Sequence, residues 1–133
     1  MTLGIGLRTF LIADASIAAL VNRERSYPIN LPQGITQTSV RYALVSGNRP
    51  FSSPSGPLEL SAPRAQIDTF APTYAEAIAL AELIRKRIDG YKGAMGSVTV
   101  QGTFFANERD GYEPESKLYF VSRDYFIWHE EDV

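Results

Sequence analysis

The pattern of hydrophobic and polar positions changes from strand-like to helix-like around Pro72. Residues 64–70 mostly alternate small or apolar side chains with polar ones, as in an antiparallel strand with one wet face. Thr73 and Glu76 then form a capping box, which predicts that a helix begins at Thr73. Gly90 is placed to end this helix. The segment therefore predicts a strand joined to an amphipathic helix by one short turn, and its chemistry is structural rather than catalytic.

The predicted helix has one apolar and one polar side when residues are placed at 100° intervals. The apolar side, expected to face the core, consists of Tyr74, Ala77, Ile78, Leu80, Ala81, Ile84 and Ile88. Leu83 falls outside this side and is interpreted either as a lone exposed leucine or as part of a subunit contact. The basic residues Arg85, Lys86 and Arg87 indicate either a solvated face, favourable at a helix C-terminus, or a contact with an acidic patch on a neighbouring subunit.

The rest of the chain predicts an N-terminal helical segment and further strands. Apolar residues at roughly helical spacing over residues 3–21 predict one helix with a break near Asp14. Residues 39–47 and 97–106 alternate as strands do. Residues 118–128 predict a strand that is aromatic and apolar on most of both faces, which suggests a central position or a covered face.

Two segments are predicted to be loops. Residues 48–57 contain three prolines and three serines and form the tip of a long hairpin between the strands 39–47 and 58–70. Residues 49–57 are expected to be mobile in the lone subunit, because their composition buries little apolar area. Residues 107–117 are interpreted as a charged turn that contains an Asp-Gly pair and a proline.

The order helix, strand, strand, helix, strand, strand predicts an α+β fold. We expect a four-stranded, mainly antiparallel sheet, with one long capped helix packed on one face and an N-terminal helical segment. The 133 residues are 44% hydrophobic and 21% charged, so we expect residues 1–133 to form a single domain with an ordinary core.

Composition excludes several classes of function. The chain has no cysteine, so it has no thiolate zinc site, disulfide or thiol nucleophile. The net charge of −2 and the scattered basic residues argue against nucleic-acid binding by the lone subunit. The longest apolar run, residues 10–13, is far shorter than the ~20 residues of a membrane span. No signal peptide is recognisable, so we expect a soluble chain that stays in the cytoplasm where it is made.

No residue is assigned a catalytic, cofactor-binding or metal-binding role, and we do not expect an enzyme. His129 is the only histidine and adjoins an acidic tail near an end expected to fray, so it is interpreted as a solvated terminal residue. Gly4-Ile5-Gly6 lacks the strand, the third glycine and the acidic residue of a dinucleotide-binding fingerprint.

Several stretches share their order and spacing with a known family, and together they cover nearly the whole chain. They are residues 7–21 leading to 26–28, the turn 32–34, and residues 40–47, 65–70, 73–77, 108–114 and 125–128. In these stretches the chain resembles the small tail-completion or tail-terminator proteins of long-tailed bacteriophages and of phage-derived gene transfer agents.

The resemblance implies a non-enzymatic virion protein at the head–tail junction, assembled in the host cytoplasm. It implies a homo-hexameric ring that caps the tail tube protein and offers a surface to the head-completion or connector protein, while DNA passes through the lumen without specific binding. The expected contact residues are Arg49, Pro50, Phe51 and Ser52 in the loop, Leu83, Arg85 and Arg87 on the helix, and Arg109, Asp110, Tyr112 and Glu113 in the charged turn. The alternatives are a head-completion (neck) ring protein and, from another class, a small-ligand or enzymatic domain that uses the sheet face as a pocket.

Overall fold

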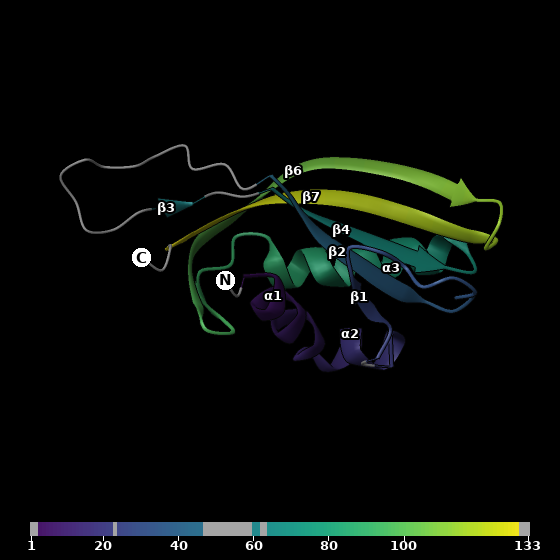
Figure 1. Cartoon of the computed structure of the whole chain (residues 1–133), viewed down its shortest axis with the longest axis horizontal. Coiled ribbons are helices and arrows are strands. Elements are labelled where there is room, and N and C mark those ends of the chain that lie inside the picture. Colours follow the sequence, from purple (N-terminus) through teal and green to yellow (C-terminus); the bar gives the residue numbers. More distant parts are fainter. Residues whose placement is uncertain (1–2, 23, 47–59, 62–63, 131–133) are drawn as a thin grey trace.

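The computed structural model describes residues 3–22, 24–46, 60–61 and 64–130 (Figure 1). Within these ranges the chain forms, in order, α1 (Leu3–Ile12), α2 (Ala15–Leu20), β1 (Ser26–Pro28), β2 (Ser39–Ser46), β3 (Leu60–Ser61), β4 (Arg64–Ala71), α3 (Tyr74–Ile88), β5 (Gly93–Met95), β6 (Val98–Glu113) and β7 (Leu118–Glu130). The predicted mobile loop at residues 49–57 lies outside the described residues.

The described strands form one sheet in the order β1-β2-β4-β7-β6-β5, and β3 pairs with one end of β7. β1 runs parallel to β2, whereas all other pairs are antiparallel. The α+β class and the mainly antiparallel sheet are thus confirmed, but the prediction of four strands is wrong. The four predicted strands are β2, β4, β6 and β7. β1 lies in residues 26–29, which the sequence indicates as a short extended piece. The predicted strand 58–70 contains both β3 and β4, and β3 pairs with β7 rather than with β2. β5 has only three residues, too few for an alternating pattern to be recognised.

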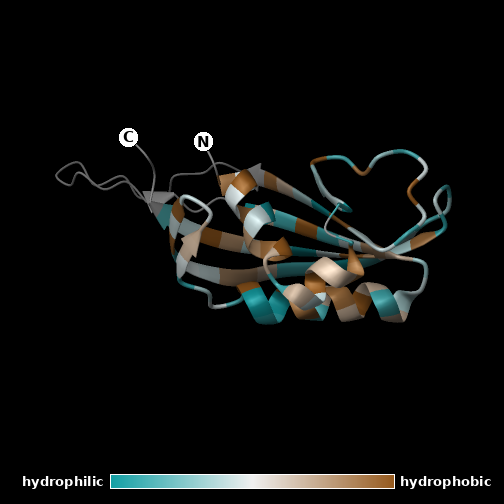
Figure 2. Cartoon of the chain, turned by 90° about the horizontal axis from the view of Figure 1, so that it is seen from below, coloured by the Kyte–Doolittle hydropathy of each residue, from teal (hydrophilic) through white to brown (hydrophobic). Residues whose placement is uncertain are grey.

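The helices lie on one face of this sheet (Figure 1). Figure 2 shows hydrophobic and hydrophilic residues side by side along them, as expected for helices with one buried side. The core between helices and sheet includes Leu7, Ile17, Ile67, Leu80, Ile84 and Tyr125. Burial of each large apolar side chain contributes about 1.5–3 kcal/mol. No helix in the described ranges is long and apolar enough to cross a membrane.

The long helix α3 begins and ends as the sequence predicts. The hydroxyl of Thr73 accepts a hydrogen bond from the backbone N–H of Glu76 at 3.2 Å, and Gly90 follows the helix with a φ of +77°. Five residues of the predicted apolar side are buried, namely Ala77, Leu80, Ala81, Ile84 and Ile88. Tyr74, the first residue of α3, was expected among them but is 42% exposed.

The N-terminal segment breaks where the sequence predicts. Asp14 caps α2 by accepting hydrogen bonds from the backbone N–H groups of Ser16 and Ile17 at 2.9 and 3.1 Å. Helix α1 approaches β5 so closely that a Cβ at Gly6 would collide with the carbonyl oxygen of Met95. Gly6 is therefore a packing residue rather than part of a nucleotide-binding loop.

Strand β6 extends much further than the sequence predicts. The segment 107–117 was interpreted as a charged turn, yet β6 continues to Glu113 and pairs residue by residue with β7. The Asp-Gly pair lies inside the strand, where Gly111 pairs with Phe120 and a Cβ would collide with the Phe120 ring as it is placed. The chain turns only after Glu113, where Lys117 has a φ of +59° and its N–H donates to the Glu113 carbonyl at 2.8 Å.

The interpretation of His129 as a solvated terminal residue is also wrong. β7 includes His129, which pairs with Val100 on one side and with Ser61 on the other. Its exposed fraction is 4%, and its Nδ1 lies 3.3 Å from the carbonyl oxygen of Ile127. Strand pairing on both sides therefore buries His129, although its acidic neighbours in the sequence predicted that it would be exposed.

Candidate assembly surface

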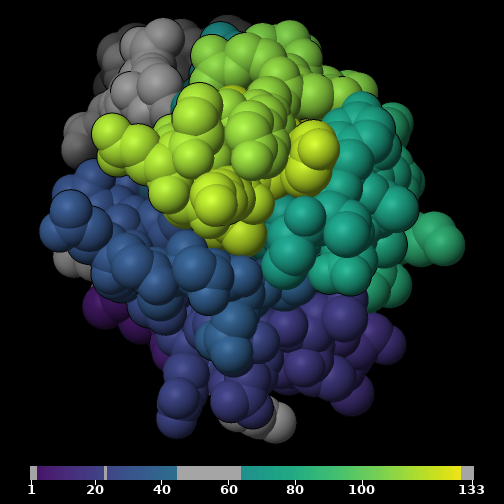
Figure 3. Space-filling model, turned by 90° about the vertical axis from the view of Figure 1, so that its right-hand side faces the viewer, coloured from purple at the N-terminus to yellow at the C-terminus, as the bar shows by residue number. Residues whose placement is uncertain are grey.

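The outer half of β6 carries four of the contact residues that were predicted from the sequence. Arg109, Asp110, Tyr112 and Glu113 are all exposed there. β5 pairs only with residues 98–100, so beyond it β6 is an edge strand among the described residues. Figure 3 shows this end of the molecule, where the green-to-yellow hairpin lies beside the teal start of α3 and the blue loop that precedes β2. An exposed edge with polar and aromatic side chains has the composition typical of a contact surface.

A tyrosine cluster connects this edge with the start of α3. The rings of Tyr112 and Tyr119 are 4.8 Å apart and those of Tyr74 and Tyr119 are 6.1 Å apart. The three side chains are between 37% and 48% exposed. The Tyr74 hydroxyl donates a hydrogen bond to the carboxylate of Asp110, and this bond is the main cause that raises the pKa of Tyr74. The cluster presents aromatic area together with polar groups, which is the composition of interface cores.

A buried arginine holds β6 against α3. Arg123 on β7 has an exposed fraction of only 6%. Its Nη2 lies 2.8 Å from a carboxylate oxygen of Glu82 on α3, and its Nε lies 2.6 Å from one of Glu108 on β6. Burial acts to lower the pKa of Arg123, but the hydrogen bonds to both carboxylates raise it overall. The hydrogen bond from Arg123 also lowers the pKa of Glu82. We call this group the Arg123 clamp.

The two arginines predicted as contact residues on α3 have partners within the subunit. Arg85 stacks over the ring of Phe105 at 4.4 Å and lies 3.6 Å from the carboxylate of Asp89. Arg87 stacks over Phe10 at 4.1 Å, and its Nε donates to the Phe10 carbonyl oxygen at 2.6 Å. Arg87 thus fastens α3 to α1.

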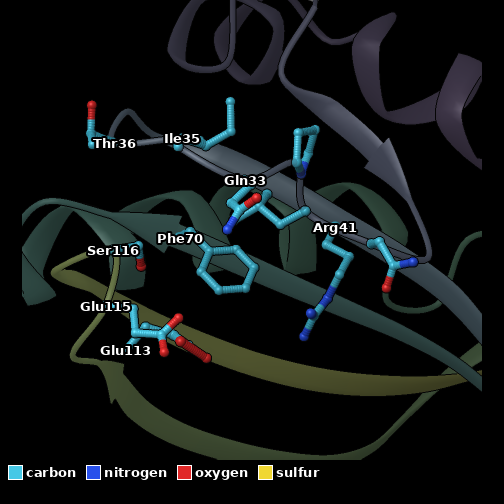
Figure 4. A pocket seen from close by; sticks show the side chains of 12 residues that line it. Gln33, Ile35, Thr36, Arg41, Phe70, Glu113, Glu115 and Ser116 are labelled. Carbon is cyan, nitrogen blue, oxygen red and sulfur yellow. The ribbon is translucent and has the colours of Figure 1, made fainter.

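A hollow of about 430 Å³ lies beside the end of the β6–β7 hairpin (Figure 4). It is lined by residues 30–36 together with Arg41, Phe70, Glu113, Glu115 and Ser116. Arg41 donates from Nε to Asp68 at 2.8 Å, so its charge is already compensated. Neither histidine nor cysteine lines the hollow, and the described residues hold no cluster of three or more potential metal ligands. The arrangement offers contact surface rather than acid–base or metal chemistry.

Comparisons with known proteins place the chain in a family. The family model described as tail completion protein gp17 matches residues 6–130. The chain belongs to this tail completion family. The solved virion of a native gene transfer agent particle contains a chain of the same fold, with a TM-score of 0.71, 20% identity, and coverage of 97% of this chain and 95% of that one. No curated protein matches the sequence. The resemblance to tail completion proteins inferred from the sequence is thereby confirmed.

In this tail completion protein the predicted contact residues fall into separate groups. Asp110 and Tyr112 join the tyrosine cluster, and Glu113 lines the hollow. Leu83 is half-buried and packs against the core. The loop residues Arg49, Pro50, Phe51 and Ser52 lie outside the described residues. Sequence reasoning missed Tyr74 as a contact residue, because a helical wheel cannot show where the sheet ends. It missed the Arg123 clamp because Glu108 was placed in a turn.

The face of the sheet opposite the helices carries two neighbouring ion pairs. Arg41 pairs with Asp68, and Arg64 pairs with Asp124, with Nη2 and Oδ2 2.6 Å apart. The carboxylates are buried, at 1% and 9% exposure, while about a third of each arginine side chain remains exposed. These two positive charges therefore each have a carboxylate directly beside them, which weakens their field in solvent.

Proposed function

We propose that six copies of this chain form a ring that terminates the tail tube and joins the tail to the head connector. The observation that carries the proposal is the match of the tail completion family over residues 6–130. The site of action is the head–tail junction of the virion, and assembly takes place in the host cytoplasm. The partners are the tail tube protein on one side of the ring and a head-completion or connector protein on the other.

The shape of the subunit supports ring formation. A cyclic ring needs a head-to-tail contact, in which two different surfaces of the subunit meet. The sheet has two unlike edges, since β1 and β2 form one side and β6 with β5 the other. Each edge carries its own set of exposed side chains. An isologous dimer would need only one such surface.

The ion pairs of the open sheet face support passage of DNA without tight binding. Protein that binds nucleic acid nonspecifically does so by presenting unpaired Lys and Arg to phosphates. Arg41 and Arg64 are instead matched by buried carboxylates on the same face. A lumen lined by the part of this face that holds the two ion pairs would attract the duplex only weakly.

The contact between neighbouring rings is proposed to use the loop at residues 49–57 and the outer half of β6. We expect deletion of residues 51–56 to leave the subunit folded and to abolish head joining; loss of folding would show that the loop is structural. The charge reversal Arg109→Glu on the exposed edge is expected to reduce the number of joined particles. Lys92→Glu, an equal change at another exposed position, is the matched control.

Electron microscopy of tails made with and without the protein tests the proposed function. With the protein, we expect sixfold rings at tail ends, tails of uniform length and joined heads. Without it, tails of uncontrolled length that fail to join heads are expected. Tails of normal length in its absence would assign the protein to the neck ring instead. Native mass spectrometry of detached rings measures the number of copies.

A further inference from the structure

The hollow beside the end of the β6–β7 hairpin carries two carboxylates without a cationic partner. Glu113 and Glu115 line it, and both are exposed. None of the ion pairs within the described part of the chain includes either carboxylate. Arg41 is the one cation among the described residues that line the hollow, and it already pairs with Asp68. The hollow therefore presents negative charge that nothing in the described subunit compensates.

The wall opposite these carboxylates is uncharged. It consists of residues 30–36, which include no charged residue and contribute the half-buried side chain of Ile35. Figure 4 shows the ring of Phe70 between the two glutamates and Ile35. Arg41 stacks over this ring at 5.2 Å, so it cannot turn to the glutamates without losing both that contact and its ion pair. A charged wall facing an apolar one suits the charged end and the methylene stem of a lysine or arginine side chain.

The number and the sign of these groups decide which ligand fits. Ca²⁺ takes about six to eight oxygen ligands, whereas the described residues here offer two carboxylates and no cluster of three potential metal ligands. A phosphate of DNA would be repelled by both glutamates. A basic side chain from another protein gains an ion pair with the carboxylates and leaves the existing pairs of the subunit intact.

The other side of the same hairpin also favours cations. Tyr112 and Glu113 are consecutive in β6, so their side chains lie on opposite faces of the sheet. The exposed rings of the tyrosine cluster attract positive charge to their faces, and Asp110 adds a carboxylate beside them. Arg109 and Lys117 are near in sequence, but neither lines the hollow. Two independent features on either side of the hairpin thus indicate a basic partner.

The hollow lies at the ends of the strands, not along an edge of the sheet. Ser39, the first residue of β2, pairs with Phe70 near the end of β4, and Phe70 pairs with Phe120 near the start of β7. Figure 3 is viewed onto this end, where the blue loop before β2 lies beside the green-to-yellow hairpin. The edges proposed for ring formation run along the strands, so a copy bound at an edge leaves this end open to a protein outside the ring.

We propose that the hollow binds a lysine or arginine side chain of a protein in the adjacent ring. The inference rests on the proposed contact between neighbouring rings and adds the chemistry of the partner. The cation lies between Glu113 and Glu115, its methylene groups lie against Ile35, and the surface around it contacts the tyrosine cluster. Charge pairs of this kind raise the rate at which two surfaces associate, and salt weakens the effect.

Charge reversal at the hollow is the first test. Glu113→Lys and Glu115→Lys are each expected to lower one of two fractions about tenfold or more: tails that carry a ring, or ringed tails that join heads. The fraction that falls identifies the neighbour that binds the hollow. Glu24→Lys, at an exposed position that does not line the hollow, is the matched control and should change neither. Urea unfolding of the free subunit and the number of copies in detached rings should match the wild type.

The salt dependence of the affected step separates charge from shape. Added NaCl should slow this step more for the wild type than for the double variant Glu113→Gln with Glu115→Gln, because the variant has fewer charges to screen. Equal salt dependence of the two proteins overturns the inference.

Photo-cross-linking identifies the partner residue. A photoreactive amino acid in place of Ser116, which lines the hollow, is expected to couple in assembled particles to a different protein, at or beside a lysine or arginine. Reversal of that residue to glutamate should restore assembly with Glu115→Lys, because the two charges are then exchanged. Failure of this rescue overturns the inference, and so does a cross-link to another copy of this chain.

The remaining outcomes separate this inference from the proposed function. Sixfold rings that join heads normally with both lysine variants overturn the inference and leave the proposed function standing. Absence of any ring of this protein on wild-type tails refutes the proposed function and the inference together.

Discussion

Replacement of both carboxylates of the Arg123 clamp tests how the fold tolerates a buried cation. The side chains of Glu82 and Glu108 are 46% and 44% exposed, whereas that of Arg123 is 7% exposed. Glu82→Gln or Glu108→Gln alone leaves one carboxylate in place, so each is expected to cost about 1 kcal/mol after allowance for solvent screening. The double variant leaves a buried guanidinium with neutral acceptors only, and we expect a loss of about 3 kcal/mol. The double variant should thus exceed the sum of the singles by about 1 kcal/mol.

Urea unfolding of the purified subunit measures these differences. Trp128, the only tryptophan, lies on β7, the strand that carries Arg123, and provides a fluorescence signal of unfolding. The midpoint should fall while the slope stays constant, since the fold and the area exposed on unfolding do not change. Glu115→Gln is the matched control, because Glu115 is exposed and outside the clamp. We expect it to change the free energy of unfolding by less than about 0.5 kcal/mol.

The clamp also predicts how stability depends on pH. The pKa of Glu82 lies below its ordinary value of 4.5 in the folded protein, chiefly because Arg123 donates a hydrogen bond to it. A carboxyl group with a lowered folded pKa stabilises the fold above its unfolded pKa, and this contribution disappears as the pH falls through the folded value. Wild-type stability should therefore fall faster than that of Glu82→Gln as the pH drops below 4.5.

Two results would refute the reasoning about the clamp. A coupling energy between Glu82→Gln and Glu108→Gln below about 0.5 kcal/mol is indistinguishable from additivity, and would mean that the carboxylates do not share one buried charge. The variant Arg123→Met removes the buried charge itself and is expected to cost less than the double glutamine variant. A larger cost for Arg123→Met would show that the arginine acts through packing rather than through its charge.

Three further changes test local features of the fold and the tyrosine cluster. Gly6→Ala should destabilise the subunit by about 2 kcal/mol in urea unfolding, because the new Cβ meets the β5 backbone. The control is Gly4→Ala in the same helix, which has open space around it and should be neutral or stabilising. Thr73→Ala should cost about 1 kcal/mol through loss of the cap, and no change in the urea midpoint would contradict the capping bond. Asp110→Ala should lower the pKa of Tyr74 toward 10.0, measured by NMR titration of labelled tyrosines, and an unchanged pKa would exclude the hydrogen bond as its cause.

The sequence was most informative where local chemistry alone decides the structure. Helix α3 follows from Thr73 at its start, Gly90 after its end and apolar spacing between them. The hairpin of β2 and β4 was likewise predicted and is observed as an antiparallel pair. In both cases the signal lies in consecutive residues, so no knowledge of distant partners is required.

Prediction failed where a distant partner determines the conformation. The second half of β6 is charged and exposed, so it shows no alternation, and it is a strand only because β7 pairs with it. Gly111 resembles a turn residue but lies within the strand, directly against the ring of Phe120 across the sheet. His129 is buried for the same reason, since two other strands flank it. The contact residues on α3 were hardest to judge, because the partners of Arg87 and Leu83 come from other elements.

The position of β7 has a consequence for how the protein is made. It pairs with β4 on one side and with β6 on the other, yet it follows both in the chain. Until residue 130 has left the ribosome, β7 is incomplete and cannot pair along its whole length. The edges of β4 and β6 that it covers in the folded subunit then stay accessible to other nascent chains. Synthesis rate and chaperone supply, rather than final stability, should therefore limit the yield of native subunits during a burst of particle production.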